Sequence, residues 1–390
     1  MKINLISINN KHSLSEDCEM IFETLKKFYS RKKKILFQFC QFHKNMANVA
    51  DVNIFVGVIN NSFFKYAPIN ILVIDQQKFN KSWIPYLSRL DYVICKNEYS
   101  KNIMETYLDK KKIFNLGWKT LDKYTFSLEK KYEDYLFVLG QSNYRQFEQV
   151  LDMWKEEYPK LNILSGLNFL KNKGYTKKEQ SNINYIEKYQ TTPEYLTLLN
   201  EKGIHICLSS CSSYSNTLHD CISSKSVPIT LDSPPFKEYI IDNVSGFLVK
   251  QKKKKKLKYF LGSEFLIDQE NLVTVIEKVN KLIETDELKL EEMGEKARKN
   301  NQLSHREFDK KFKTFFDNIW DTYKQNIPIK NNYECFDEDF PSVSVITPTY
   351  NRKYLFDLSI RNFTHTDYPT DKIEWIIIDD SEEEDLKDKL

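Results

Sequence analysis

The chain has 390 residues, of which 41% are hydrophobic and 14% aromatic, so it can bury sizeable cores and is not a disordered chain. Its 58 basic and 55 acidic residues leave a net charge of +3, which argues against a dedicated nucleic-acid-binding protein. The 7 cysteines include no CxxC pair and predict a reducing compartment without a zinc site. No run of about 18 apolar residues is present, so we expect no membrane span and a cytoplasmic location, in a host cell if the gene is viral.

Short apolar runs alternate with helical patterns in the first part of the chain. We expect strands at 2–8, 35–40, 52–59, 69–75 and 92–96, and helices at 15–29, 82–90 and 98–108. Continuous apolar strands separated by helices indicate a parallel sheet covered on both faces. Residues 1–130 are therefore predicted to form one doubly wound α/β domain.

A second series of the same kind predicts another doubly wound domain over 131–305. We expect strands at 135–140, 161–166, 184–189, 204–208 and 226–232, helices at 144–157, 193–201 and 216–224, and a hairpin-like turn at 245–250. The lysine-rich run QKKKKKLKYF at 251–260 is interpreted as a solvated loop rather than a phosphate or membrane patch.

The remaining chain is predicted to be a long helical region and a short tail. Apolar spacing predicts helix from 270 to 325, and its aromatic end, FKTFFDNIWDTY, must be buried against something. We expect 306–327 to pack back on the first domain and 328–340 to be a linker. Residues 341–390 then look like the β–α–β start of a further domain.

The segment CSSYSNTLHDC follows an apolar strand and opens a helix, which makes it the most informative polar stretch. Ligands of open parallel sheets bind beyond the carboxyl ends of strands, and a helix start favours an anion such as a diphosphate. The alternative is that these residues only cap the helix. Capping needs one serine or asparagine rather than five, so the ligand interpretation is favoured.

These residues resemble the donor-site signature of retaining GT-B glycosyltransferases of the family 4 type. The match is SSCSSYSNTLHDCISSKSVPIT followed by PPFKEYIIDNVSGFLV. The resemblance places Asp220 on the carboxylate that holds the nucleotide ribose and Ser212 on the one that holds the transferred sugar. It also assigns Ser215, Asn216 and Thr217 to the diphosphate. Here Ser212 replaces a glutamate, which removes a charge.

Other segments match the same family in the same order. FVLGQSNYRQFEQVLDMW resembles the opening of its second domain, which implies that Gly140, Ser142 and Arg145 contact the diphosphate. The segment FNLGWKTLDKY resembles its interdomain connection, and Tyr189 would lie by the base. The fold implied is α/β with two Rossmann-like domains that face a cleft.

The acceptor is expected on loops of the first domain. The loops around 9–13 and 75–78 are the best placed, which selects Asn10, His12 and Gln76 as acceptor-side candidates. His43 is interpreted as a loop or packing histidine. Lys96 ends a strand and could face the cleft, but it is interpreted as a solvated lysine. No catalytic residue stands out.

The tail carries its own resemblance. VSVITPTYNR and EWIIIDDS resemble the start of family-two GT-A glycosyltransferases, so a second glycosyltransferase domain is expected in the full-length protein.

The sequence thus predicts a retaining transferase that moves a hexose from a nucleotide sugar, with UDP-glucose as first choice, to a glycan or other hydroxyl acceptor without a metal. Alternatives are a GDP-mannose-dependent mannosyltransferase, a catalytically weak nucleotide-sugar-binding module and a nucleic-acid-binding protein that uses the lysine run. The last conflicts with the weak net charge.

Overall fold

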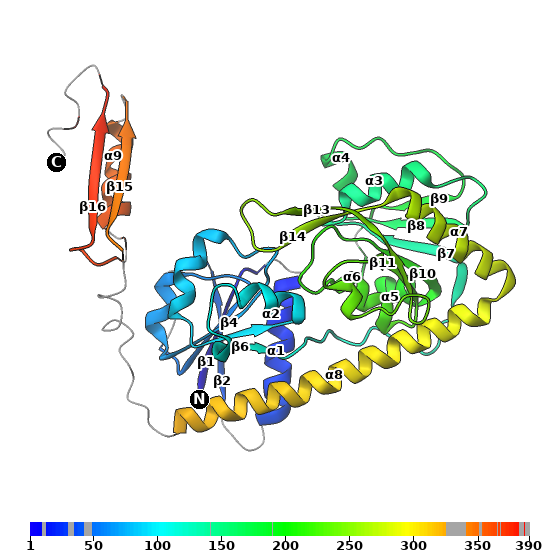
Figure 1. The fold of residues 1–390 in the computed structure, drawn as a ribbon, viewed down its shortest axis with the longest axis horizontal. Coiled ribbons are helices and arrows are strands. Elements are labelled where there is room, and N and C mark those ends of the chain that lie inside the picture. The colour runs from blue at the N-terminus through cyan, green and yellow to red at the C-terminus, as the bar shows by residue number, and fades with distance from the viewer. Residues whose placement is uncertain are drawn as a thin grey trace.

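The computed structural model describes residues 1–9, 13–29, 35–42, 49–140, 142–188, 190–324, 341–350, 353–364, 366, 368–381 and 386. Two α/β domains lie side by side, and a long helix runs along both of them (Figure 1). A short β–α–β unit follows at the C-terminal end.

The first domain is a parallel six-stranded sheet in the order β2-β1-β3-β4-β5-β6. Its strands are β1 (Lys2–Ser7), β2 (Leu36–Gln41), β3 (Val52–Val56), β4 (Ile69–Val73), β5 (Tyr92–Cys95) and β6 (Ile113–Asn115). Its helical segments are α1 (Ser13–Tyr29), η1 (Asn61–Tyr66), η2 (Lys81–Arg89), α2 (Glu98–Met104) and η3 (Lys110–Lys112). The central strands are buried on both faces, as their apolar runs predict.

Two details of this domain differ from the sequence prediction. The segment expected to be a helix at 82–90 is 3₁₀-helical, and it contains Pro85, which cannot supply an α-helical N–H bond. The short strand β6 was not expected. Its three residues form the edge of the sheet, and they overlap the start of the predicted interdomain segment.

The second domain is also built on a parallel six-stranded sheet, in the order β12-β11-β10-β7-β8-β9. Its strands are β7 (Lys131–Val138), β8 (Lys160–Leu164), β9 (Ile183–Ile186), β10 (Lys202–Cys207), β11 (Val227–Leu231) and β12 (Phe247–Val249). Its helical segments are α3 (Tyr144–Met153), α4 (Phe169–Asn172), α5 (Thr192–Glu201), α6 (Asn216–Ser223), η4 (Phe236–Glu238) and α7 (Gln269–Thr285). The hairpin expected at 245–250 is wrong, because β12 pairs in parallel with β11.

The lysine run is a strand rather than the predicted loop. Strand β13 (Gln251–Lys256) pairs antiparallel with β14 (Ser263–Ile267), and all of its side chains are exposed. The tip of this hairpin reaches the first domain, where the Lys81 N–H donates to the Tyr259 carbonyl at 2.9 Å. Leu261 is 2% exposed and packs among the apolar residues of the first domain. The hairpin therefore ties the two domains together.

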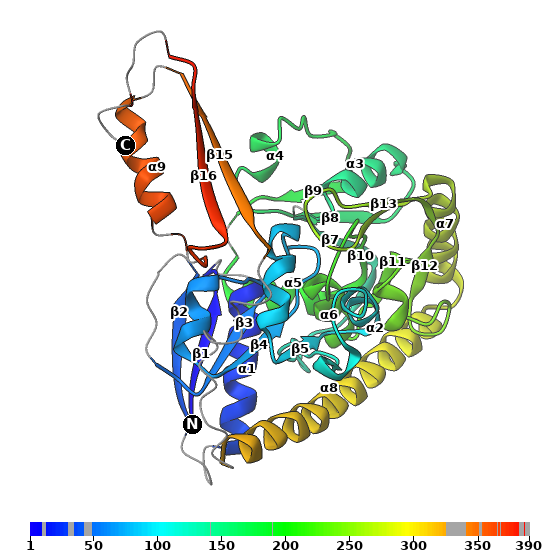
Figure 2. The same cartoon turned by 60° about the vertical axis from the view of Figure 1, so that its left-hand side comes forward.

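The last helix, α8 (Glu287–Lys324), is the second tie between the domains. It packs against α6 and β11 in the second domain and continues along the first (Figure 2). Its aromatic residues join the core formed by α1 and one face of the first sheet. The aromatic residues are Phe308, Phe312, Phe315 and Phe316, and Ile319 joins them. The segment is too apolar to lie in water, and packing against the first domain buries its aromatic stripe.

Gly294→Ala is expected to destabilise the protein, although alanine favours helix over glycine by about 1 kcal/mol at an open site. Helix α8 passes so close to Lys225 that an added Cβ would lie 2.1 Å from its carbonyl oxygen. We expect the shift of the helix to cost about 1–3 kcal/mol. Thermal unfolding measures this, with the exposed Lys299→Ala as the control; a raised melting temperature in Gly294→Ala would contradict the close approach.

The C-terminal unit has the β–α–β order that the sequence predicts. Strands β15 (Val343–Thr349) and β16 (Ile373–Asp379) pair in parallel, and α9 (Lys353–Thr364) connects them. Along both strands exposed residues alternate with half-buried ones.

Candidate functional site

The carboxyl ends of β7 and β10 meet at the topological switch point of the second sheet. Strand β7 pairs with β8 on one side and with β10 on the other. The connection after β7 leads to β8, whereas the connection after β10 leads in the opposite direction to β11. Ligands of such sheets bind in the crevice outside these strand ends. The loop after β7 and the serine-rich loop after β10 are joined there, because both the N–H and the hydroxyl of Ser210 donate to the Ser142 carbonyl at 2.9 Å.

The loop after β7 and the start of α3 contain three predicted diphosphate residues. The N–H of Gly140 donates to Asn143 Oδ1 at 2.7 Å, and a Cβ added at Gly140 would meet no atom within 4 Å. Ser142 contributes its carbonyl to the neighbouring serine loop. The side chain of Arg145 is 62% exposed and lies 3.6 Å from the Glu264 carboxylate on β14. Arg145 is thus a surface cation beside the loop, paired within its own domain.

The serine-rich loop contacts the first domain directly. The Gln76 side-chain amide donates to the Ser212 carbonyl at 3.0 Å, and the Ser213 hydroxyl donates to the Asp75 carboxylate. The Asn97 amide donates to the Ser213 carbonyl as well. Ser212, at the predicted sugar position, and its neighbour Ser213 therefore form part of the interface between the domains. Their partners lie more than a hundred residues away in the sequence, so local pattern could not identify them.

The start of α6 is not capped by a serine side chain. Ser215 occupies the N-cap position with a left-handed φ of 59° and makes no capping hydrogen bond. Its hydroxyl lies 3.3 Å from that of Thr217, and the Asn216 amide donates to Glu16 of α1 at 2.5 Å. Capping thus does not explain these residues, and the first N–H groups of α6 have no acceptor within the helix itself.

A buried aromatic group anchors the same loop. The Tyr214 ring stacks on the His219 ring, with centroids 3.8 Å apart, and the Tyr214 hydroxyl donates to the Trp118 carbonyl at 3.1 Å. Burial lowers the pKa of His219 to about 3, so its ring is neutral at ordinary pH. The loop is therefore positioned by packing before any ligand binds.

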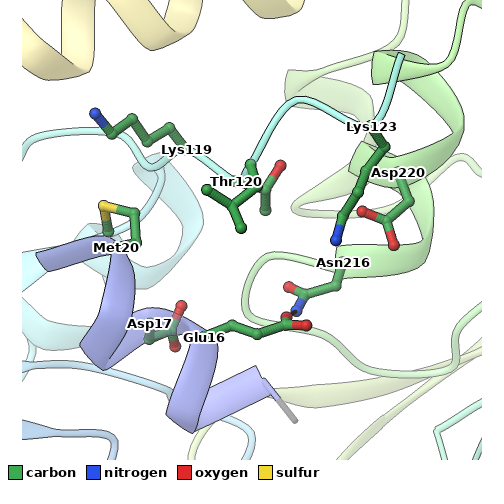
Figure 3. Close-up of a pocket in the computed structure, with 9 residues that line it drawn as sticks. Glu16, Asp17, Met20, Lys119, Thr120, Lys123, Asn216 and Asp220 are labelled. Carbon is green, nitrogen blue, oxygen red and sulfur yellow. Dashed lines mark hydrogen bonds between the residues drawn. The ribbon is translucent and has the colours of Figure 1, made fainter. Parts of the chain in front are cut away.

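Asp220 lies one turn into α6 and is buried. Burial raises the pKa of its carboxyl to about 6, while Lys123 and the hydroxyl of Tyr195, which donates to Asp220 at 2.8 Å, oppose the rise. Asp220, Lys123, Asn216 and Glu16 line a hollow of about 20 Å³ between the domains (Figure 3). This volume holds about one water molecule. A buried carboxyl group with a raised pKa is rare in proteins as a whole, and such groups are concentrated at functional sites.

Two neighbours of Asp220 were missed by sequence reasoning. Tyr195 lies within α5, in a segment that was matched only as a helix, and nothing in its sequence context marks it. Lys123 belongs to the segment between the domains, which was matched to the family without assigning it a role. That segment also supplies Trp118, whose ring nitrogen donates to buried Asp17 at 2.8 Å.

Asn10, His12, His43 and Tyr189 lie outside the described residues. Gln76 is described and lies at the domain interface, where it is 1% exposed.

In the described part of the chain, no three His, Cys, Asp or Glu side chains come together as a metal site would require. Over the same residues, no helix combines the length and apolar character of a membrane span.

Two Rossmann-like sheets joined across an interface define the fold class as GT-B, as the sequence resemblance implied. Solved structures share this architecture at low sequence identity, which shows the fold alone. The chain matches a glycosyltransferase from Rickettsia africae ESF-5 with a TM-score of 0.59 and 11% identity, covering 82% of this chain and 98% of that one. It matches Anabaena Alr3699/HepE in complex with UDP with a TM-score of 0.56 and 10% identity, covering 83% and 100%.

A third match is the pneumococcal O-GlcNAc transferase GtfA in complex with UDP and GlcNAc, with a TM-score of 0.50 and 13% identity. It covers 69% of this chain, which in turn spans only 57% of the GtfA structure. Neither the protein-family models nor the sequences of curated proteins match the chain.

Proposed function

We propose that this protein is a retaining glycosyltransferase that transfers a hexose from a nucleotide sugar to a hydroxyl acceptor. One observation carries the proposal: a buried carboxylate, Asp220, lies one turn into the helix that follows the serine-rich loop, at the switch point of a GT-B domain. UDP-glucose is our first choice of donor, since the comparison structure of Anabaena HepE was solved with UDP and glucose.

In this proposal the donor is held by a carboxylate at one end and by N–H groups at the other. Ionised Asp220 accepts hydrogen bonds from the ribose hydroxyls. The start of α6 and the Ser142 loop hold the diphosphate, where unpaired N–H groups and the helix dipole favour negative charge. Arg145 adds a cation if it leaves Glu264, to which it is only loosely paired at 3.6 Å. These groups would stabilise the leaving diphosphate without a metal.

The transfer itself exchanges one bond at the sugar for another. The bond from C1 of the hexose to the diphosphate oxygen breaks, and the acceptor oxygen bonds to C1 on the same face, which retains the configuration. The acceptor proton passes to the leaving phosphate oxygen, so no protein base is required.

Donor binding needs movement of the two domains. The hollow of about 20 Å³ beside Asp220 is far smaller than a nucleotide sugar. The interface is closed by the hydrogen bonds that Gln76 donates to Ser212 and that Ser213 donates to Asp75. We infer that the donor replaces these contacts when the domains separate. Because the hairpin tip and α8 hold the domains elsewhere, the movement would pivot about those two ties.

A binding module without turnover is the second candidate. Ser212 stands where the resemblance implies a sugar-binding carboxylate, and its carbonyl is used by Gln76. A module of this kind would bind UDP and leave the donor intact. A mannosyltransferase that uses GDP-mannose remains the alternative within the transferase class.

Donor turnover tests the proposal. We expect one nucleotide sugar from a panel of UDP and GDP sugars to release its nucleotide, slowly by hydrolysis and faster with an acceptor, while EDTA is present. Free UDP or GDP is measured by chromatography. UDP binding without release from any donor, even with glycan acceptors, would favour the binding module. Release only after manganese is added would contradict the metal-free mechanism.

We further propose that the C-terminal β–α–β unit belongs to a GT-A-like domain, as the sequence resemblance implies. Ile346 and Ile378 are 59% and 52% exposed on its parallel strands. Parallel sheets are normally covered on both faces, so these side chains call for additional packing partners.

A further inference from the structure

A second hollow lies on the first domain, away from Asp220. Its volume is about 360 Å³, within the range of small-molecule sites. Besides Ile59, three aromatic and three uncharged polar residues line it: Phe42, Trp83, Tyr86, Asn60, Asn61 and Ser82. None of them is among the candidate residues predicted from the sequence.

The hollow lies at the switch point of the first sheet. Strand β1 pairs with β2 on one side and β3 on the other, so the crevice opens where these strands end. Phe42 directly follows β2, and its N–H donates to the Ser7 carbonyl at the end of β1 at 2.8 Å. Asn60 and Asn61 come after β3, and Trp83 lies in η2, which comes after β4. All of these residues therefore gather at the carboxyl edge of the sheet.

The walls of the hollow are held in place by the surrounding protein. The Trp83 ring packs edge-on against buried Phe79, with centroids 5.4 Å apart, and lies 6.0 Å from the ring of Phe42. The Asn60 amide donates to the Phe42 carbonyl at 2.8 Å, and its oxygen accepts from the N–H of Ser62 at 3.1 Å. A ligand would thus meet a preformed surface, which lowers the entropic cost of binding.

The chemistry of the lining selects the class of ligand. A pyranose ring has faces of C–H groups, which carry partial positive charge and pack on the electron-rich face of an aromatic ring. Its hydroxyls need amide and hydroxyl partners around the edge, which asparagine and serine supply. Among the described residues no charged side chain lines the hollow, which disfavours a phosphate or a nucleotide.

We propose that this hollow binds a neutral hexopyranose unit of the acceptor, so that the acceptor is a glycan. The assignment as an acceptor site rests on the proposed transferase function, whereas sugar binding itself does not. One segment of the first domain connects the serine-rich loop with this hollow. Asp75 and Gln77 contact Ser213 of the loop, and Ser82 and Trp83, which line the hollow, follow within a few residues. A glycan held at Trp83 could therefore extend along this segment to the domain interface.

Saturation-transfer NMR with methyl glycosides of glucose, mannose and galactose tests the site. We expect at least one to bind the wild-type protein, and Trp83→Leu to weaken it about fivefold to tenfold because the aromatic face is lost. Tyr107→Ala removes an aromatic side chain that is 41% exposed and does not line the hollow, so it is the matched control and should bind normally. Tyr86→Leu provides a second variant if Trp83→Leu fails to fold.

UDP titration of the same samples separates this proposal from the proposed function. Sugar binding lost in Trp83→Leu or Tyr86→Leu with UDP binding unchanged supports the site. No saturation transfer from any glycoside, or equal transfer in wild type and both variants, overturns it. Sugar binding that depends on Trp83 in a protein that neither binds nor turns over UDP sugars would keep the site and overturn the transferase.

Discussion

Asp220→Asn is expected to raise the stability of the protein near neutral pH and to weaken UDP binding about tenfold. The carboxylate is buried, and its pKa of about 6 in the folded protein exceeds the ordinary value of 3.8. Asparagine has the same shape and can still accept the hydrogen bond from Tyr195. The substitution removes a buried charge that destabilises the folded protein. It also removes the carboxylate, which is a stronger hydrogen-bond acceptor for the ribose hydroxyls than an amide is.

The sign of the effect follows from the direction of the pKa shift. Because the folded pKa is raised, the stability gained from protonation is complete below about pH 4 and is lost as the pH rises through about 6. Over that window the free energy of unfolding of Asp220→Asn should come to exceed that of the wild type, by up to about 3 kcal/mol. A higher melting temperature at neutral pH, with little difference near pH 4, is the expected pattern.

UDP binding should follow the ionisation of the same group. The affinity of the wild type is expected to fall as the pH drops below about 6, because protonated Asp220 loses its charge-assisted hydrogen bonds. The variant should show no such fall. Calorimetric titration measures both, and Asp152→Asn, which changes an exposed aspartate of the same domain, is the control. Unchanged UDP affinity in folded Asp220→Asn would remove Asp220 from the donor site.

The fold could be predicted because its signal is local and repeated. Apolar runs such as those of β3 and β4 are buried on both faces, and helical patterns separate them, so the two parallel sheets follow. The hairpin of β13 and β14 could not be predicted in this way. Five successive lysines have the composition of a solvated loop, and only the burial of Leu261 in the other domain shows why the segment pairs.

For the candidate site, the position of Asp220 in a helix could be predicted, but its contacts could not. The spacing within CSSYSNTLHDC predicts that Asp220 lies one turn into a helix, and in the structure it lies one turn into α6. The burial of Asp220 and its bond to Tyr195 depend on how α5 packs beside α6, which no pattern in either helix records. In the same way, Ser213 meets Asp75 and Asn97 only because two domains come together.

Lys96 is another residue whose contacts could not be predicted from the sequence, and its contact contributes more to the free energy of unfolding. At the end of a strand it was interpreted as a solvated lysine, and that is wrong: its side chain is 4% exposed and lies 2.5 Å from the carboxylate of Asp17. Its ammonium group also lies 4.7 Å from the centre of the Trp118 ring. Two charges buried together stabilise each other, but either one alone would be left without compensation.

Lys96→Met is therefore expected to destabilise the protein by about 3–5 kcal/mol, because it leaves Asp17 buried without its cation. Asp17→Asn alone should also be costly, since it strands the ammonium group. The double variant Asp17→Asn/Lys96→Met removes both charges, and the new amide can still accept the hydrogen bond from Trp118. It should recover much of the loss, with a coupling energy of about 1–3 kcal/mol.

Urea unfolding of the wild type, both single variants and the double variant measures this coupling. Lys101→Met is the control, because Lys101 forms an exposed pair with Glu98 at 2.8 Å that water screens, so its midpoint should move little. Additive losses in the double variant would mean that each charge is solvated independently, and that the pair does not hold α1 to the end of β5. Coupled losses would mean that a rigid buried ion pair lies beside the hollow that Asp17 and Asp220 both line. The first domain would then keep one wall of the proposed donor site fixed while the interface opens.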